Sequence, residues 1–435
     1  MCSFTITNKN IDLLDTNFFS QKRGPDLTNS IVDKSSQISF IHNLLHLTGE
    51  KTKQPFYQDD VYCVFNGEIY NYNSFGNYKT DGECLIPLYK EYGIDFVKKL
   101  DGEFAICIID CKNNYLIMVN DTFATKPIWF SKQDTFFGVS SYESSLRLSG
   151  FNSIEKLSGN TAYKLNLKTL EEIEIVKLKE FDLNQHKDTY DDWIVSFEKS
   201  ISKRVNTTKG IFLGLSAGYD SGAITCELSK QNIDFNAYTI LSSENKDIIN
   251  QRHSRLNKSE IIQLTKKEYD EVQNFLQYNC EDFIYQNYNI KNDKASKGLG
   301  AICSRANNNG ERVYLSGQGA DEIISDYGYN GNKIYNHSEF GGKFPNDLSE
   351  LFPWNSFYDG TQIKYLNKEE YVAGAYGIET RYPFLDTELV QEFLWLSSDL
   401  KNKQYKAPLT EYLERNNYPF EKGIKTGFRA NTNLI

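Results

Sequence analysis

The sequence of 435 residues lacks several features that would place it in a common class of proteins. It has no excess of positive charge, because 48 Lys and Arg residues face 58 Asp and Glu residues, for a formal net charge of −10. A general binder of nucleic acid or of anionic membranes needs a basic surface that releases counterions, so we expect neither partner. No apolar run approaches the roughly 18 residues of a membrane span. The opening MCSFTITNKN lacks the basic-then-apolar order of a signal peptide.

Histidine is scarce and the cysteines are scattered. The chain has five His and eight Cys, and no two cysteines form a CxxC pair, so we do not expect a structural zinc site. Several cysteines, such as Cys63 and Cys107, lie within apolar segments. We interpret them as reduced and mostly buried, which predicts a cytoplasmic protein. The length fits two domains that each bury a core.

The pattern of the chain changes near residue 182. Before it, short apolar runs alternate with turn signals, which predicts antiparallel sheets, with one helix at 82–92 that ends at Gly93. The polar stretch 182–192 is interpreted as a linker. From Trp193 onward strands alternate with helices, which predicts a parallel sheet. The segments expected there are helices at 193–205, 223–230 and 260–276, strands at 210–215, 235–240 and 312–315, and loops at 285–296 and 326–344.

Two features of the first half suggest acyl-transfer chemistry. Cys2 follows the initiator methionine, and removal of Met1 would leave a thiol beside a free α-amino group with a pKa of about 7.7–8.0, which can take the thiol proton. FNGEIYN, at 65–71, ends a predicted strand in a turn. There the Asn66 amide and the Gly67 backbone N–H could hold a tetrahedral oxyanion. A plain Asn-Gly turn is the alternative. Asp81 either caps the next helix or receives a substrate ammonium group.

Together with LDGEFA at 100–105 and DTFATKP at 121–127, these strings resemble the class II, N-terminal-nucleophile (Ntn) glutamine amidotransferase domain. The resemblance implies a four-layer αββα sandwich over residues 2–182. It implies that Cys2 attacks the side-chain amide of glutamine and releases ammonia. It also implies which residues bind glutamine: Leu47, Asn66, Gly67, Glu68 and Asp81, with Asn66 and Gly67 holding the oxyanion.

One position departs from this family. The family usually carries an arginine that pairs with the α-carboxylate of glutamine, and Leu44 stands in its place. A bidentate guanidinium–carboxylate contact is among the strongest polar contacts, so its loss should raise the KM for glutamine. His42, His46 or another basic group could substitute for it.

GLSAGYDSGA, at 214–223, lies where a predicted strand becomes a helix. Its small residues allow the backbone to approach a phosphate closely, and the helix N-terminus adds partial positive charge. The string lacks GxxxxGK[ST], so it is not a Walker-type loop. Asp220 would repel phosphate unless a cation lies between them, which points to Mg²⁺. The alternative is a strand–helix turn in which Asp220 is only a cap.

A second loop, LSGQGADEI at 315–323, follows another predicted strand and adds Asp321. Two strand-end loops that carry Asp fit ligand binding at the carboxyl edge of a parallel sheet. GIETRYPFLD, at 377–386, predicts a helix followed by a loop, in which we interpret Glu379 and Arg381 as a structural pair.

These strings resemble the synthetase domain of glutamine-dependent asparagine synthetases and their relatives, including β-lactam synthetases. SGGxDS appears as SAGYDS, SGEGxDE as SGQGADE, and G[LVI]ExRxPFLD is intact. The resemblance implies a parallel-sheet PP-loop ATP pyrophosphatase domain over 193–435 that uses ATP and Mg²⁺. It implies ATP contacts at Gly214, Ser216, Gly218, Asp220, Ser221, Ile240, Ser316 and Gly317, with Mg²⁺ at Asp220 and Asp321. Lys406 and Lys425 would neutralise charge that develops on pyrophosphate.

Three positions near the expected acceptor depart from asparagine synthetases. Gln318 replaces a Glu and cannot act as a base, and Lys294 replaces an Arg before Ala-Ser. Asp326 would bring negative charge toward an aspartate-shaped pocket, which would favour a cationic or differently shaped acceptor.

Three hypotheses follow. The first is a ligase that releases ammonia from glutamine and amidates a carboxylate adenylated by ATP; aspartate is placed slightly ahead of a sugar acid, peptide or small metabolite. The second is a non-catalytic relative. Against it, the motif residues Cys2, Asn66, Asp81, Asp220, Asp321 and Lys425 are all retained. The third keeps the ATP chemistry and uses free ammonia. The expected partners are glutamine and the acceptor, and a homodimer is left open.

Overall fold

The computed structural model of the protein describes residues 2–241 and 244–425. The chain forms two compact units. One comprises the residues up to Glu180 together with Asn279–Glu281 and Gly374–Gly377, and the other comprises the rest. Among the described residues, no helix is long and apolar enough to cross a bilayer.

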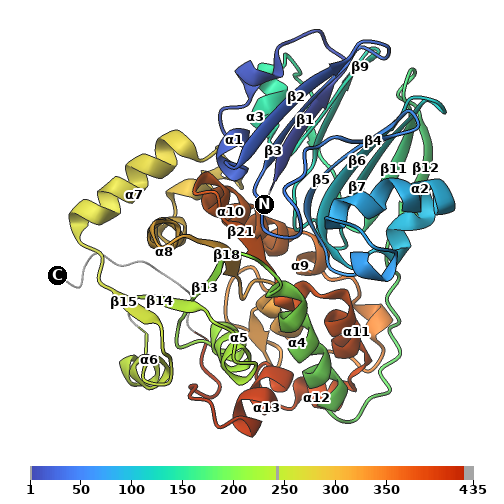
Figure 1. The fold of residues 1–435 in the computed structure, drawn as a ribbon. Helices are drawn as coiled ribbons and strands as arrows, with labels where there is room; N and C mark the ends of the chain where they lie inside the picture. Colours follow the sequence, from blue (N-terminus) through green and yellow to red (C-terminus); the bar gives the residue numbers. More distant parts are fainter. Residues whose placement is uncertain (1, 242–243, 426–435) are drawn as a thin grey trace. The chain divides into compact units, whose positions relative to one another are not determined.

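The first unit is built on two antiparallel sheets of six strands each (Figure 1). One sheet has the order β10-β8-β9-β1-β3-β2 and the other has the order β12-β11-β7-β6-β5-β4. The strands of the first sheet are β1 (Ser3–Thr7), β2 (Leu27–Asp33), β3 (Ile38–Leu44), β8 (Trp129–Gln133), β9 (Phe136–Ser140) and β10 (Glu155–Lys156). Those of the second are β4 (Phe56–Gln58), β5 (Val61–Ile69), β6 (Gly102–Asp110), β7 (Tyr115–Asn120), β11 (Thr161–Asn166) and β12 (Glu172–Lys177).

The pleat of the central strands explains why these sheets stack. Successive side chains of a strand point to opposite faces. On β5, Cys63 and Phe65 join a core on one side of the sheet, while Val64 joins a second core on the other side. On β6, Ile106 and Cys107 divide in the same way. The second core also receives side chains of β1, β3, β8 and β9, so it fills the space between the two sheets.

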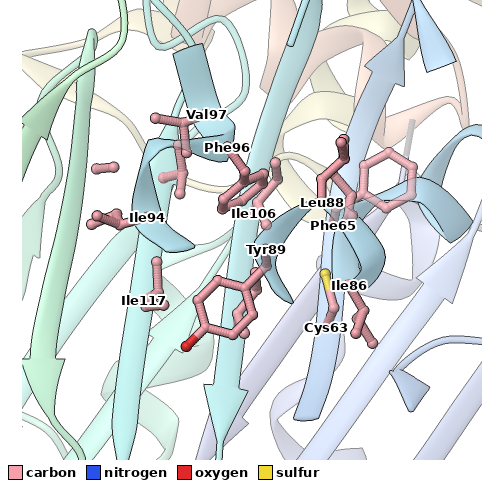
Figure 2. Close-up of a cluster of buried hydrophobic side chains, with 14 of the residues drawn as sticks. Cys63, Phe65, Ile86, Leu88, Tyr89, Ile94, Phe96, Val97, Ile106 and Ile117 are labelled. Atoms are coloured by element: carbon pink, nitrogen blue, oxygen red, sulfur yellow. The ribbon is translucent and has the colours of Figure 1, made fainter. Parts of the chain in front are cut away.

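Helical segments cover the outer face of each sheet. On the second sheet lies α2 (Leu85–Tyr92), flanked by 3₁₀ segments at Asp81–Cys84 and Gly93–Lys99. Figure 2 shows its Ile86, Leu88 and Tyr89 in the cluster that also contains Phe65 and Ile106 of the sheet. On the first sheet, α1 (Ser20–Arg23) contacts β1 and β3, and α3 (Glu143–Leu148) contacts β8 and β9. The predicted four-layer αββα sandwich is confirmed.

The second unit contains a five-stranded sheet of order β15-β14-β13-β18-β21, in which all neighbouring pairs are parallel. The predicted parallel sheet is therefore confirmed. Its strands are β13 (Gly210–Gly214), β14 (Asn236–Ile240), β15 (Ser259–Ile262), β18 (Glu311–Leu315) and β21 (Glu379–Arg381). Two short hairpins are formed by β16 (Ile284–Tyr285) with β17 (Tyr288–Asn289) and by β19 (Gly328–Tyr329) with β20 (Asn332–Lys333).

The helices of this part of the chain alternate with the strands of the parallel sheet and then follow its last strand. They are α4 (Asp191–Arg204), α5 (Tyr219–Lys230), α6 (Lys246–His253), α7 (Lys266–Asn279), α8 (Lys294–Asn308), α9 (Asn355–Tyr358), α10 (Gly360–Ala375), α11 (Thr387–Trp395), α12 (Ser398–Asn402) and α13 (Ala407–Arg415).

Four predicted segments are wrong, and one of them is the loop expected at 326–344, which contains the hairpin of β19 and β20. The helix expected at 260–276 begins only at Lys266, after the edge strand β15, because Thr265 and Glu268 form a capping box there. The loop expected at 285–296 contains a hairpin and the start of α8, which Asp293 caps through the Ser296 amide. The helix expected at the start of 377–386 is the strand β21.

Candidate functional site

Cys2 directly precedes β1 and is buried, with 6% of its surface exposed. Its Sγ lies 4.0 Å from the carbonyl oxygen of Leu45. Met1 lies outside the described residues, so removal of this residue stays a prediction. In the sheet, β1 pairs with β3, and Phe4 is opposite His42. Burial lowers the pKa of His42 to about 3, so this ring is neutral and does not supply the charge of the family's arginine.

Asn66 and Gly67 lie near the end of β5, as a donor pair requires. Asn66 is fully buried, and among the residues that the structure describes neither its side-chain nitrogen nor its side-chain oxygen has a hydrogen-bond partner. A buried amide without partners costs free energy, so its position fits a group that receives a ligand. Gly67 has a φ of +126°, and a Cβ there would lie 1.9 Å from the carbonyl oxygen of Glu103. Only glycine fits this position.

The other residues expected to contact glutamine are Leu47, Glu68 and Asp81, and all three are buried. The Asp81 carboxylate accepts hydrogen bonds from the backbone N–H groups of Ile69 and Gly82, both at 2.9 Å. It therefore holds the turn after β5. Glu68 and Leu47 are buried, with 8% and 2% of their surfaces exposed. Their roles toward glutamine stay predictions, like those of Cys2 and Asn66.

In the second unit, the predicted phosphate loop connects β13 to α5. The Ser216 and Ser221 hydroxyls lie 2.8 Å apart, and the Gly218 N–H donates to the Ser216 Oγ at 3.1 Å. These bonds fold the loop tightly over the N-terminus of α5. The loop lines a cavity of about 700 Å³, as do Ser316, Gly317 and every other predicted ATP-binding residue except Ile240. Ile240 is buried at the end of β14 and is not among the lining residues.

Four charged side chains meet in this cavity. The Lys406 ammonium lies 2.5 Å from Asp220 Oδ1 and 2.8 Å from Asp321 Oδ1, and Lys425 pairs with the other oxygen of Asp321. Burial raises the pKa of Asp220. At Asp321 burial acts in the same direction, but the two lysines outweigh it and hold the pKa of this carboxyl well below its usual range. Both aspartates thus face the cavity beside cations, although they come from different loops.

These two carboxylates suit a magnesium ion. Both pair with the ammonium group of Lys406, so the two carboxylates are close enough together to be ligands of one cation. Among the described residues, no group of three or more His, Cys, Asp or Glu could hold a metal. Mg²⁺ usually takes only one or two carboxylates and completes its octahedron with water and substrate phosphates, so this donor set fits.

The Asp326 carboxylate is bound by a neighbouring loop. This carboxylate is fully buried and accepts hydrogen bonds from the backbone N–H groups of Glu339 and Phe340, at 2.7 and 2.8 Å, and from two serine hydroxyls. The Asp326 carboxylate therefore does not line the cavity, but its charge still acts on His337, which does, so the prediction of negative charge close to the acceptor pocket stays a prediction.

Gln318 and Lys294 do line the cavity. The Gln318 amide donates to the Glu322 carboxylate at 2.6 Å, and the Tyr327 hydroxyl contacts the same oxygen. Burial, and next the charge of Asp321, raise the pKa of Glu322 to about 7. The Glu322 carboxylate therefore holds the Gln318 side chain in place. Gln318 is an amide and does not take the role of the Glu that asparagine synthetases carry at this position.

Motifs did not reveal two further groups of residues at this site. Arg252, on α6, is fully buried behind the phosphate loop, where it donates to the carbonyl oxygens of Ser216 and Gly218 at 2.5 and 2.8 Å. Glu244 accepts the Ala217 N–H of the same loop at 2.7 Å. The second group lies on α10 and in the preceding loop: Tyr335, His337, Lys364, Tyr365, Lys368 and Glu369. The sequence feature that could have revealed the α10 residues is the Lys-Tyr-x-x-Lys spacing of residues 364–368.

Comparison with known proteins agrees with both halves. A family model described as "Glutamine amidotransferase domain" matches residues 3–170, and one described as "Asparagine synthase" matches residues 195–362. A relative from Methanocaldococcus jannaschii, named as a candidate glutamine-hydrolyzing asparagine synthetase, is 27% identical over 419 residues, covering 85% of this chain and 72% of the relative.

Two further relatives carry the same name without a qualifier. Asparagine synthetase [glutamine-hydrolyzing] 2 of Bacillus subtilis is 24% identical, covering 92% of this chain and 68% of its own. The Gallus gallus enzyme is 26% identical, covering 82% and 68%. A solved glutamine phosphoribosylpyrophosphate amidotransferase from B. subtilis covers 91% of this chain and 92% of its own at 11% identity and a TM-score of 0.34, which is too weak a similarity to support an argument.

The fold and the two matched domains define a carbon–nitrogen ligase in which a glutamine amidotransferase domain of the Ntn type precedes an ATP-using synthase domain. The chain belongs to the glutamine-dependent asparagine synthetase family. Its chemistry is therefore an ATP-dependent amidation that draws nitrogen from glutamine and needs a carboxylate acceptor.

Proposed function

We propose that the protein hydrolyses glutamine at Cys2 and uses the ammonia to amidate an acceptor carboxylate that ATP has adenylated, with aspartate as the acceptor. The observation that carries this proposal is the shared cavity in which the phosphate loop, Asp220, Asp321, Lys406 and Lys425 meet. Aspartate is placed first because the curated relatives are named for asparagine synthesis.

In the glutaminase site the Cys2 thiol would attack the amide carbon of glutamine, and the α-amine would take the thiol proton and return it to the leaving ammonia. The Asn66 amide and the Gly67 N–H would donate to the oxyanion. This assignment gives the buried and unpartnered Asn66 amide a function.

In the synthetase site the loop amides and the serine hydroxyls would hold the phosphates of ATP. Asp220 and Asp321 would bind Mg²⁺, which neutralises phosphate charge when it is bound. Lys406 and Lys425 are held in the cavity by the two aspartates, where they can stabilise the negative charge of the departing pyrophosphate.

The test is to incubate the purified protein with ATP, Mg²⁺, glutamine and a panel of carboxylates that includes aspartate, and to measure AMP, pyrophosphate and the amide product. We expect aspartate to give stoichiometric AMP, pyrophosphate and asparagine. Cys2→Ala should abolish turnover with glutamine and keep turnover with ammonium chloride. Absence of pyrophosphate with every acceptor would refute the ligase chemistry proposed for this cavity, while turnover of a different acceptor would refute only aspartate.

A second candidate is a ligase that mainly uses free ammonia. Leu44 and the neutral His42 favour it, because neither side chain supplies the cation expected for the α-carboxylate of glutamine. The same assay decides between the two. A KM for glutamine far above that for ammonia would favour this candidate, and a glutamine KM in the low millimolar range or below would refute it.

A further inference from the structure

Residues 416–425, here called the Lys425 segment, follow α13 and bring Lys425 to the cavity without forming a helix or strand. Lys422 and Gly423 in this segment are exposed. The ion pair of Lys422 with Glu414 lies at the surface, with 58% and 43% of the two side chains exposed, so it contributes little. A segment that buries so little surface opens easily unless particular contacts hold it.

One side chain of the phosphate loop holds this segment close to Lys425. Tyr219, the first residue of α5, is buried, with 3% of its surface exposed. Its hydroxyl oxygen accepts the Gly423 N–H at 2.7 Å, and its ring meets the Phe420 ring edge-on, with the centroids 5.2 Å apart. Tyr219 therefore contacts the segment at two points, and the second of them lies two residues before Lys425.

Two arginines hold the Lys425 segment further back. Arg252 donates to the carbonyl oxygen of Pro419 and Arg255 donates to that of Asn417, both at 2.9 Å. Both carbonyls lie at least six residues before Lys425 in the chain. These bonds fix the start of the segment and leave the position of the lysine to contacts nearer to it.

The ion pair at the lysine itself is shared with other cations. Lys425 pairs with Asp321, but the same carboxylate also pairs with Lys406 and is one of the two proposed Mg²⁺ ligands. The bond from the Gly423 N–H to the Tyr219 hydroxyl, in contrast, involves no group that the chemistry needs. This bond can therefore keep the segment in place while the cations of the cavity rearrange.

The Tyr219 ring also contacts the segment that carries the other lysine. Tyr405, directly before Lys406, lies edge-on to Tyr219 with the ring centroids 5.4 Å apart. A variant that removes only the hydroxyl keeps the ring beside Tyr405 and Phe420. It therefore isolates the bond to Gly423.

We infer that Tyr219 is a positioning residue that holds Lys425 at the pyrophosphate end of the cavity through the Gly423 N–H. This inference rests on the role proposed for Lys425. An ammonium group stabilises developing negative charge best when it is already in place, because nothing then has to reorganise at the moment of reaction. Tyr219 supplies no charge and acts through the backbone of the segment.

The first test measures Lys425 without any turnover. The full chain, free of nucleotide, is treated briefly with an acetylating N-hydroxysuccinimide ester, and peptide mass spectrometry gives the rate at each lysine. Only 14% of the Lys425 side chain is exposed, so Tyr219→Phe should raise its rate at least about threefold by loosening the segment. The rates at exposed Lys267 and buried Lys406 should not change. An equal rate at Lys425 in both proteins would overturn the inference.

The second test separates the position of Lys425 from the binding of ATP. Tyr219→Phe should lower kcat for pyrophosphate release about tenfold, since a displaced group loses much of its effect, and should change the Kd of a non-hydrolysable ATP analogue less than about twofold. In a Lys425→Met background, Tyr219→Phe should lower kcat no further, because the two residues act as a unit. Additive losses would overturn the inference, since a general structural defect adds to the loss of Lys425.

Two further variants complete the test. Tyr190→Phe is the matched control, because this buried hydroxyl donates to the Leu400 carbonyl oxygen at 2.8 Å and Tyr190 does not line the cavity; it should change neither readout. Gly423→Ala strains the segment without touching the core, because Gly423 has a φ of +77° and no described atom lies within 4 Å of an added Cβ. It should reproduce both effects of Tyr219→Phe, and it decides the question if that variant is poorly folded in a thermal melt.

The two readouts separate this inference from the proposed function. If the wild-type protein releases no pyrophosphate with any acceptor but Tyr219→Phe still exposes Lys425, the positioning role stands and the proposed chemistry fails. If the wild-type protein is active and Lys425 reacts at the same rate in both proteins, the chemistry stands and the assignment of Tyr219 fails.

Discussion

At the scale of single residues, Lys406 is the most constrained side chain of the synthetase site. Its backbone is in the left-handed region, with φ at +44°, which is costly for a residue other than glycine. Its side chain is 1% exposed and pairs with both Asp220 and Asp321. The ion pairs hold this residue at the N-terminus of α13 in spite of the backbone strain.

Lys406→Met should therefore have two effects. Two buried carboxylates would lose a partner, and breaking such pairs typically costs about 3–5 kcal/mol, so the melting temperature should fall. Pyrophosphate release should fall by about 10²-fold or more, since a charge that stabilises the transition state is typically worth this much. Glutamine hydrolysis should continue, because Cys2 belongs to the other unit.

The measurement is pyrophosphate release alongside glutaminase activity and a thermal melt. Lys403→Met, at an exposed position three residues earlier, is the control and should change none of the three. Pyrophosphate release by Lys406→Met at the wild-type rate would show that Lys406 is only a structural counter-ion.

At the scale of elements, the local sequence pattern was enough to predict a strand or helix whose residues alone favour that structure. The strand that ends within FNGEIYN and the strand-to-helix change at residues 214–223 were predicted correctly. The failures at β15 and β21 are edge strands of the parallel sheet, which form because β14 and β18 offer them partners. Such pairing is set by tertiary context, which a window of one sequence does not contain. The domain limits at 182 and 193 stay predictions.

The residues of the candidate site likewise divide into those that a local motif reveals and those that it does not. Asp220 and Asp321 could be found because each belongs to a short motif whose members are close together in sequence. Arg252 could not, because its partners are distant in sequence: it contacts the loop 34 residues before it. The sequence position of Asp326 did not show the direction of its side chain, and the carboxylate turns toward the 338–340 loop.

The phosphate loop provides a prediction at this scale. Arg252 holds the carbonyls of Ser216 and Gly218 from behind, which fixes the loop through contacts with α6. Arg252→Met keeps much of the side-chain volume but leaves these carbonyls without a donor. We expect the KM or Kd for ATP to rise at least tenfold, which is about 1.4 kcal/mol. Arg252→Lys keeps the charge but has no planar fork, so it should rescue binding only in part.

The readout is binding of a non-hydrolysable ATP analogue, with glutaminase activity as the control for folding of the chain. Arg255→Met is the matched variant, because Arg255 also lies over the Tyr418 ring but donates to the carbonyl oxygen of Asn417 rather than to the loop. Unchanged ATP affinity in Arg252→Met would show that the loop keeps its shape without this support.

At the scale of the whole molecule, several buried carboxyl groups make stability depend on pH. Glu369 lines the synthetase cavity, and burial raises its pKa to about 7, while Ser316 and Lys368 act against this shift. Its Oε2 atom has no hydrogen-bond partner among the described residues. A carboxyl group in such a place is protonated more readily in the folded chain than in the unfolded one.

The sign of the effect follows from this difference. Between pH 4.5, the ordinary value for Glu, and about pH 7, the folded state holds a proton that the unfolded state has lost. Stability therefore falls as the pH rises through this window, by at most about 1.4 kcal/mol per pH unit for one such group. Glu322, whose pKa is also raised to about 7, contributes in the same direction. Glu369→Gln removes one of these protons without a large change of shape.

Urea unfolding at pH 5 and pH 7.5 tests this linkage. The wild-type midpoint should be lower at pH 7.5, and the difference between the two pH values should be smaller in Glu369→Gln. The variant should gain stability mainly at the higher pH, where the wild-type carboxylate is charged and buried. Glu271→Gln, at an exposed position on α7, should keep the wild-type difference. An equal pH dependence in wild type and Glu369→Gln would mean that Glu369 ionises at an ordinary pH, and that water or Lys368 stabilises its charge within the cavity.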